Sequence, residues 1–250
     1  MKKALQMLLA LMIAAVLSTA AAAPAEPKDE GLMLKDPIEG VVEQPESADA
    51  YQAAFLLRYQ YPQFEAHTEA DEDINRYYQA LAQDSAAVAQ TLAAMGEYAQ
   101  ADIRCEVSHV SDRYVSVKQI LAAEGGNGPV ETLSADTFAR DGMYAGQMVT
   151  LSQILGLEED GGLSDEHSMA EELVYSLVWQ IVSRGMENAE GDYVDGLTEE
   201  SLKHAFQPEN SFYLDMDGNL VFFIQAGEIA GEIAGILEFP FAPAEILSVL

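Results

Sequence analysis

The sequence has few of the residues that several classes of protein require. Its 250 residues include a single cysteine, Cys105, which excludes an internal disulfide and a cysteine-based zinc site. Basic residues are also scarce, with 12 lysines and arginines against 42 acidic residues and a formal net charge of −30. Nucleic acid and anionic membranes are therefore poor partners, because like charge repels them, and basic proteins are the natural complement.

Familiar catalytic motifs are absent as well. The sequence has no Gly-x-Ser-x-Gly, Ser-x-x-Lys or His-Glu-x-x-His motif and no glycine-rich phosphate-binding loop. Among 42 acids, carboxylate pairs are expected by chance and do not indicate acid–base catalysis. We therefore expect no catalytic residues, no cofactor and no metal site, and the pattern singles out no binding residue.

Two local patterns resemble parts of known sites but are incomplete. Asp215-Met-Asp-Gly-Asn begins like a calcium-binding EF-hand loop, but Leu220 stands at the sixth position and Ala226 at the twelfth, so we expect a hairpin turn. Cys105 and His109 share one face of a predicted strand, but four strand residues span about 13 Å, which is too far for a thiol and its base.

The remaining histidines give no complete site. His167 and Glu171 are one helical turn apart, which is half of a metal site, but no second histidine lies nearby in the sequence. We expect both side chains to be solvated near a helix start. His67 and His204 have no recognisable partners in the sequence.

The N-terminus is typical of a secretory signal peptide, residues 1–22. Lys2 and Lys3 precede an apolar run from Ala4 to Leu17, and small residues follow, so cleavage is expected between Ala22 and Ala23, with Ala25 as a second position. An uncleaved anchor is the alternative. After cleavage no stable membrane insertion is expected, and the secreted chain carries 10 basic and 42 acidic residues, a net charge of −32. Residues 23–49 are rich in proline and charge, and we expect a disordered linker there.

Hydrophobic periodicity predicts an α+β fold with an N-terminal part at 50–128 and a C-terminal part at 129–250. Strands are expected at 51–61, from 103, at 114–121 and at 131–138, with a glycine-rich loop at 125–129, and helices at 69–98 and near 146–155. Ser164 or Ser168 is expected to cap a further helix, the latter through a capping box with Glu171. Its predicted buried stripe comprises Met169, Leu173, Val174, Leu177, Val178, Ile181 and Val182. A brief helix at 198–206 precedes a hairpin of 211–214 and 220–224 around Asp217-Gly218.

The repeat GEIAGEIAG, from Gly227 to Gly235, has glycines at the spacing that allows membrane helices to pack closely. Three glutamates, Glu228, Glu232 and Glu238, oppose burial in a bilayer, because each carboxylate at its centre costs about 2.5–3.5 kcal/mol. We therefore expect the repeat to join two late strands, with its isoleucines and alanines packed inward and its glycines allowing tight turns.

The stretch FYLDMDGNLVFFIQAGEIAGEIAGILEFPF, residues 212–241, resembles the end of the RsiV-like domain, an extracytoplasmic bacterial module of the anti-sigma-V factor and of some peptidoglycan deacetylases. The matching features, in order, are Phe212-Tyr213, Asp217-Gly218, the strand at 221–224, Glu228-Ile229-Ala230, Gly235 and Phe239-Pro240. GQMVTLSQIL, residues 146–155, is similar to the family's Gly-Lys-x-Leu-Thr-Leu segment. Gly227 replaces a usual tyrosine, Ala226 a proline, and Asn127-Gly128 an Ala-His pair.

This resemblance implies a secreted or envelope-associated module that binds or senses a ligand and is not an enzyme. Lysozyme is the partner it suggests, or another cell-wall ligand. An accessory or catalytic domain of a peptidoglycan-modifying enzyme is the alternative.

Overall fold

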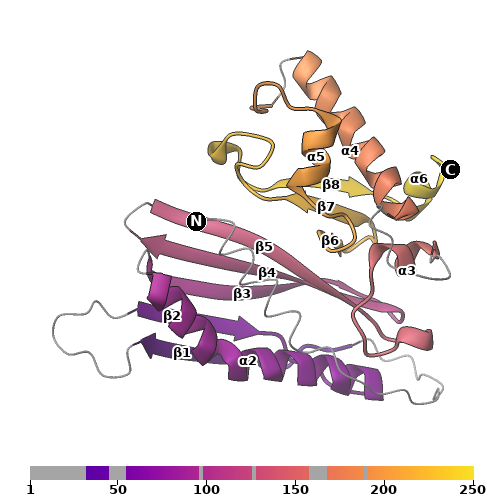
Figure 1. Ribbon diagram of the computed structural model, residues 1–250. Coiled ribbons are helices and arrows are strands. Elements are labelled where there is room, and N and C mark those ends of the chain that lie inside the picture. Colours follow the sequence, from indigo (N-terminus) through magenta and orange to yellow (C-terminus); the bar gives the residue numbers. More distant parts are fainter. Residues whose placement is uncertain (1–31, 45–54, 96–97, 126–127, 158–167, 189–190) are drawn as a thin grey trace. The chain divides into compact units, whose positions relative to one another are not determined.

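The protein has an α+β fold that divides into two compact units. The computed structural model describes residues 32–44, 55–95, 98–125, 128–157, 168–188 and 191–250 (Figure 1). The first unit comprises the described residues up to Ser134 together with Phe138–Gln147, and the second comprises Ala135–Thr137 and Met148–Leu250. The predicted signal peptide, residues 1–22, lies outside the described residues.

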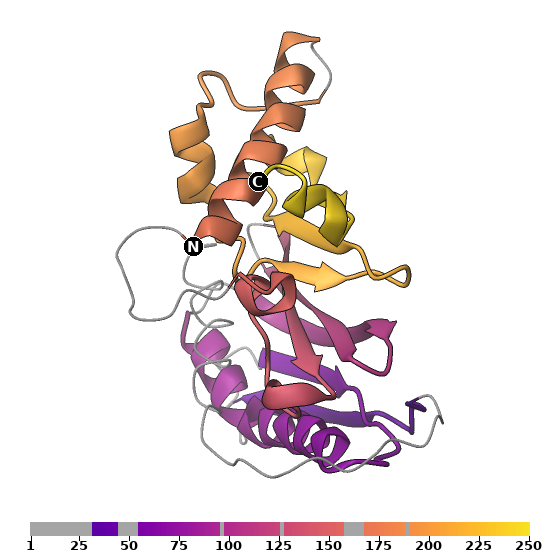
Figure 2. The same ribbon diagram turned by 90° about the vertical axis from the view of Figure 1, so that its right-hand side faces the viewer.

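The first unit is built on a five-stranded sheet in the order β1-β2-β3-β4-β5. Its strands are β1 (Ile38–Gln44), β2 (Phe55–Tyr61), β3 (Tyr98–Val110), β4 (Tyr114–Gly125) and β5 (Gly128–Ala139). Strands β1 and β2 pair antiparallel, as do β3 and β4, whereas β2 and β3 pair parallel. Helix α2 (Glu69–Met95) connects the parallel pair and lies along one face of the sheet (Figures 1 and 2).

Helix α2 confirms the helix predicted from the spacing of its apolar residues. Its buried stripe includes Ile74, Tyr77, Tyr78, Leu81, Val88 and Leu92. Tyr77 and Tyr78 meet Phe138 of β5 edge to face, with ring centroids 5.1 and 6.0 Å apart, and Tyr78 stacks on Tyr61 of β2. Such aromatic pairs stabilise by about 0.5–1.5 kcal/mol beyond the burial of their area. The first unit therefore has its own core between helix and sheet.

Strand β1 corrects the prediction of a disordered linker at 23–49 for residues 38–44, while residues 23–31 and 45–49 lie outside the described residues. Its residues alternate between half-buried and exposed, and it pairs with β2 from Ile38↔Tyr61 to Gln44↔Phe55. Charged side chains on its outer face and the flanking Pro37 and Pro45 give it the composition of a linker. The backbone hydrogen bonds to β2 stabilise this segment as a strand, and composition alone does not predict that pairing.

The second unit holds a three-stranded antiparallel sheet in the order β6-β7-β8. Its elements are α3 (Leu151–Leu155), α4 (Met169–Glu187), α5 (Glu199–Ala205), β6 (Phe212–Leu214), β7 (Leu220–Ile224), β8 (Leu237–Phe241) and α6 (Pro243–Leu247). Two short 3₁₀ helices occur at Gly142–Tyr144 in the first unit and Glu232–Ala234 in the second. Helix α4 contacts α3, α5 and α6.

The start of α4 is as predicted, and its buried face agrees with the prediction in part. Ser168 caps the helix through a capping box with Glu171, while Ser164 lies outside the described residues. Val174, Val178 and Val182 are buried as expected. Among the other predicted stripe residues, Met169 and Ile181 are 46% and 42% exposed, and Ala170 and Tyr175 are buried in addition. Tyr175 is fully buried, and its hydroxyl donates to the Phe206 carbonyl at 3.0 Å.

The predicted boundary at 128/129 falls after the first residue of β5, which is the neighbour of β4 in one sheet. The second unit begins instead near Met148, apart from the short piece Ala135–Thr137 of β5. A glycine-rich stretch between two strands can link two domains, or it can connect two neighbouring strands of one sheet. The local sequence does not distinguish these two cases.

In the part of the chain that the structure describes, no helix combines the length and apolar character needed to span a bilayer.

Candidate functional site

A buried ion pair joins the start of α2 to the end of β5 in the first unit. Asp71 is fully buried and the Arg140 side chain is only 8% exposed. Arg140 donates from Nε to Asp71 Oδ1 at 2.9 Å and from Nη2 to Oδ2 at 3.4 Å, and its Nη1 donates to the Ser111 carbonyl at 2.8 Å. The backbone N–H groups of His67 and Thr68 donate to Asp71 Oδ2, both at 3.1 Å.

These contacts favour the ionised form of Asp71. Burial by itself would raise the pKa of Asp71, but the hydrogen bonds from Arg140, His67 and Thr68 and the charge of Arg140 outweigh it, so the pKa is lower than usual. Thr68 also caps the helix, because its Oγ1 accepts from the Asp71 N–H at 3.2 Å. The Thr-x-x-Asp spacing at 68–71 is a capping-box signal, whereas the partner Arg140, 69 residues away, has no local signal.

In the second unit, Glu209 joins the first turns of two helices. Its Oε2 accepts from the Ser152 N–H at 3.1 Å, and its Oε1 accepts from the hydroxyls of Ser152 and, at 2.8 Å, Ser168. Ser152 lies in α3, and Ser168 is the cap of α4. A carboxylate is stabilised at helix N-termini by the unpaired N–H groups and the helix dipole. Glu209 therefore acts as a structural clasp, one that sequence reasoning did not identify.

The thiol and the histidine considered as a catalytic pair are separated by a bulge in β3. Cys105 pairs with Gln119 and His109 with Ser116, with a register shift between Val107 and His109. Because the pairing partners are three residues apart on β4, they lie on opposite faces of the sheet. Cys105 and His109 therefore do not share one face, which corrects that part of the prediction.

The other histidines and Glu171 were considered as possible parts of a metal site. Glu171 closes the capping box of α4, where its Oε2 accepts from the Ser168 N–H at 3.0 Å, and His167 lies outside the described residues. His67 contributes a backbone N–H to Asp71, and His204 is exposed in the last turn of α5. Within the described ranges, no three His, Cys, Asp or Glu side chains are grouped closely enough to hold a metal ion.

The Asp215 loop is a hairpin turn. One Asp215 oxygen, Oδ1, accepts from the N–H groups of Asp217 and Asn219, both at 2.9 Å, and the other accepts from the Asn219 amide. Burial opposes ionisation, but these hydrogen bonds lower the pKa of Asp215 below its usual value. The carboxylate thus holds the turn between β6 and β7, with Gly218 at a φ of 80°.

The two halves of the GEIAGEIAG repeat lie in different environments. In the first half Ile229 is fully buried and Ala230 is 4% exposed. A backbone ladder to a neighbouring segment holds this half, with Val194 N–H donating to the Ile229 carbonyl at 3.0 Å and Gly231 N–H to the Asp192 carbonyl at 2.9 Å. In the second half Ile233 is 99% exposed, which corrects the prediction that both isoleucines pack inward.

The glycines of the repeat serve different purposes. Gly227 and Gly235 adopt φ values of 80° and 71°, which favour glycine, as the predicted turns require. At Gly231 an added Cβ would lie 2.6 Å from Asp192 Oδ2, the end of an exposed side chain that can move aside. The segment joins β7 to β8 as expected.

Charge is distributed unevenly along the chain. Without the predicted signal peptide, residues 23–147 contain 8 basic and 22 acidic residues, a net charge of −14, whereas residues 148–250 contain 2 basic and 20 acidic ones, a net charge of −18. Its cations are Lys203, whose Nζ lies 2.6 Å from Glu172 Oε2, and the exposed Arg184. Two cations cannot neutralise 20 acids, so this stretch has a strongly negative net charge.

Comparison with solved structures finds the same fold in two bacterial proteins of the DUF3298 family, a domain of unknown function. The crystal structure of a member from Bacteroides fragilis has a TM-score of 0.54 and 14% sequence identity, over 86% of this chain and 98% of that one. A member from Pseudomonas aeruginosa has a TM-score of 0.53 and 12% identity, over 88% and 94%. No family model and no curated protein sequence matches the chain.

At these identities the likeness shows the fold alone. The expected α+β architecture is confirmed by the structure and by these neighbours. The DUF3298 fold is related to that of RsiV-like domains, and the RsiV-like assignment itself stays a prediction. Among the positions where the resemblance departs from its family, Gly227 lies in a turn of the repeat segment, and Asn127 lies outside the described residues.

Proposed function

We propose that this protein is a non-enzymatic, extracytoplasmic binding module whose acidic second unit binds a basic protein, with lysozyme as the candidate partner. The observation that carries the proposal is the excess of 18 negative charges in residues 148–250. A surface of one sign raises the local concentration of an oppositely charged partner and speeds their encounter.

The roles of the described carboxylates favour binding over catalysis. Asp71 is held by Arg140, Glu209 joins two helices, and Asp215 closes a turn, so each of these well-ordered acids already stabilises the fold. A general acid or base needs its proton-accepting atom free to reach a substrate. Acids exposed on the surface of the second unit, such as Asp192 and Asp195, are suited to attracting a partner.

The fold and the sequence resemblance support the choice of partner. The neighbours in the DUF3298 family share their architecture with RsiV-like domains, and the residues at 212–241 resemble that family's C-terminal signature. Lysozyme is a basic protein that acts outside the cell, where the N-terminal signal would place this chain.

A calorimetric titration with lysozyme tests the proposal. We expect saturation at one-to-one stoichiometry that persists at about 0.15 M salt, where the Debye length is near 8 Å. Cytochrome c, another small basic protein, is the control for charge alone and should not compete. Loss of lysozyme binding at that salt concentration, or equal binding of cytochrome c, would contradict a specific site.

A parallel assay distinguishes the enzymatic alternative. The purified chain is incubated with peptidoglycan, and released acetate and muropeptides are measured. We expect neither above the background of a heat-denatured sample. Release that depends on the folded chain would show a peptidoglycan-modifying activity and overturn the non-enzymatic assignment.

A further inference from the structure

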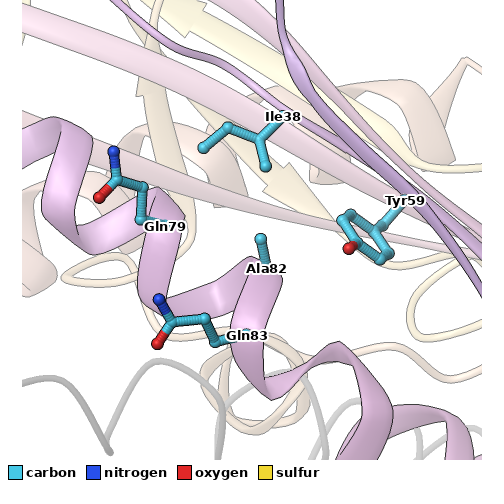
Figure 3. Close-up of a pocket in the computed structure, with 5 residues that line it drawn as sticks. All are labelled: Ile38, Tyr59, Gln79, Ala82 and Gln83. Carbon is cyan, nitrogen blue, oxygen red and sulfur yellow. The ribbon is translucent and has the colours of Figure 1, made fainter.

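A shallow groove of about 470 Å³ opens in the first unit between the edge of the sheet and α2 (Figure 3). Its lining consists of Ile38 from β1, Tyr59 from β2, and Gln79, Ala82 and Gln83 from α2. Ala82 and Gln83 follow Gln79 by three and four positions, so all three residues lie on one face of the helix. The volume falls in the range of about 300–1,000 Å³ that small-molecule sites occupy.

The position of Tyr59 depends on a glycine in the edge strand. Gly40 lies directly opposite Tyr59 in the pairing of β1 with β2. A Cβ added at Gly40 would stand 2.1 Å from the Tyr59 hydroxyl oxygen and 2.2 Å from Cζ, so the ring lies across the space that a side chain would fill. Gly40 therefore places an aromatic ring beside the groove.

The polar groups of the groove are available to a ligand. Among the described residues, no side chain or backbone group is hydrogen-bonded to the Tyr59 hydroxyl or to the amides of Gln79 and Gln83. Figure 3 shows the Tyr59 hydroxyl turned toward the side of the groove formed by α2. The floor between these polar groups is apolar, formed by Ile38 and Ala82.

The groove has no charged lining residue, although the protein carries 42 acids. The nearest acid of β1, Glu39, accepts from the Gln60 amide at 2.7 Å, and this pair alternates with Gly40 and Tyr59, so it belongs to the other face of the sheet. A second groove of about 520 Å³, lined by Leu34, Lys35, Asp36 and Gln63, contains charges and no aromatic ring.

We propose that the groove of Ile38, Tyr59, Gln79, Ala82 and Gln83 binds a neutral, hydroxyl-rich ligand, namely a saccharide. An amide both donates and accepts hydrogen bonds, as a sugar hydroxyl does, and two amides one helical turn apart match hydroxyls or acetamido groups on one sugar edge. The ring of Tyr59 and the side chain of Ile38 contact the apolar C–H face of a sugar. Anionic ligands are disfavoured by the net charge, and cationic ones find no carboxylate in the lining.

Titration of the full chain with the trimer of N-acetylglucosamine, followed by protein NMR, tests this proposal. We expect saturable shifts at the groove with a Kd of about 1 mM, a typical weak affinity. Gln79→Ala and Gln83→Ala should each weaken binding by about fivefold, the effect of one lost hydrogen bond. Gly40→Ala should displace the Tyr59 ring and weaken binding further, and thermal melting of each variant establishes that it folds.

Gln90→Ala is the matched control, because Gln90 is an exposed glutamine of α2 outside the groove. It should bind the trimer like the unchanged chain. Absence of saturation up to about 20 mM trimer, equal weakening by Gln90→Ala, or equal binding of an anionic oligosaccharide would overturn the proposal. Lysozyme binding has a separate readout, so failure of one proposal leaves the other standing.

Discussion

The two units of this protein use their charged residues in different ways. In the first unit, cations pair with acids across neighbouring strands, as in Arg58–Asp102 and Lys118–Glu106, and one pair, Arg140–Asp71, is buried. The second stretch, residues 148–250, has 2 cations for 20 acids. Several acids of the first unit are therefore paired with cations, whereas residues 148–250 have too few cations to pair with most of their acids. Such an excess is unfavourable for stability and is useful for attracting a basic partner.

The largest effect is expected from breaking the buried pair in the first unit. Arg140→Met leaves the Asp71 carboxylate buried without its cation and should lower the free energy of unfolding by about 3–5 kcal/mol. Arg58→Met is the matched control, since Arg58 and Asp102 are 49% and 36% exposed, and it should cost less than about 1 kcal/mol. Urea unfolding measures both.

The pH dependence sharpens the same test. Because the pKa of Asp71 is lowered by folding, its contribution is present above the ordinary value of 3.8 and is lost as the pH falls below it. The difference between the unchanged chain and Arg140→Met should therefore shrink on acidification below about pH 4. A difference that stays constant down to pH 2 would contradict the role given to Asp71.

The repeat in the second unit provides the next comparison within a single segment. Ile229→Ala should cost about 2–5 kcal/mol, because a fully buried isoleucine leaves a cavity. Ile233→Ala, the same change four residues later, should stay within about 0.5 kcal/mol, because that side chain is 99% exposed. Equal losses in thermal or urea unfolding would show that the two halves of the repeat are not in different environments.

A smaller effect is expected at the clasp of the second unit. Glu209→Gln keeps the shape of the side chain but replaces the carboxylate that accepts hydrogen bonds from Ser152 and Ser168 by a neutral amide. It should lower the free energy of unfolding by about 1 kcal/mol. Glu245→Gln, at an exposed position of α6, is the control. Hydrogen exchange should quicken at the first turns of α3 and α4 in the Glu209 variant alone. Unchanged exchange there would argue against the clasp.

Periodicity and turn signals predicted the local elements of the fold. The stripe of α2, the Ser168 cap of α4 and the Asp217-Gly218 hairpin follow from residues close together in the sequence. Strand β1 was missed because its pairing with β2 outweighs a linker-like composition. The exposure of Ile233 was missed because identical repeat halves give identical patterns, and only the ladder to Asp192 and Val194 distinguishes them.

The polar clusters were less predictable than the elements. Glu209 lies 57 residues from Ser152 and 41 from Ser168, and Arg140 lies 69 from Asp71. No local sequence pattern indicates which of the 42 acids has such a distant partner. The groove at Tyr59 depends on the register of β1, so it also has no local signal.

The location of the acidic binding surface is the central claim, and two charge-matched variants test it. One variant carries Asp192→Asn, Asp195→Asn, Glu228→Gln and Glu232→Gln in the second unit. The other carries Glu43→Gln, Asp112→Asn, Glu131→Gln and Asp141→Asn, four exposed acids of the first unit. Both remove four negative charges and keep the shapes of the side chains.

Lysozyme affinity of both variants is measured by calorimetry at about 0.15 M salt, where charges more than about 8 Å apart are largely screened. We predict at least tenfold weaker binding for the second-unit variant, a change of about 1.4 kcal/mol, and less than twofold weakening for the first-unit variant. Equal weakening of the two variants would show that net charge alone attracts lysozyme and would contradict a binding surface on the second unit.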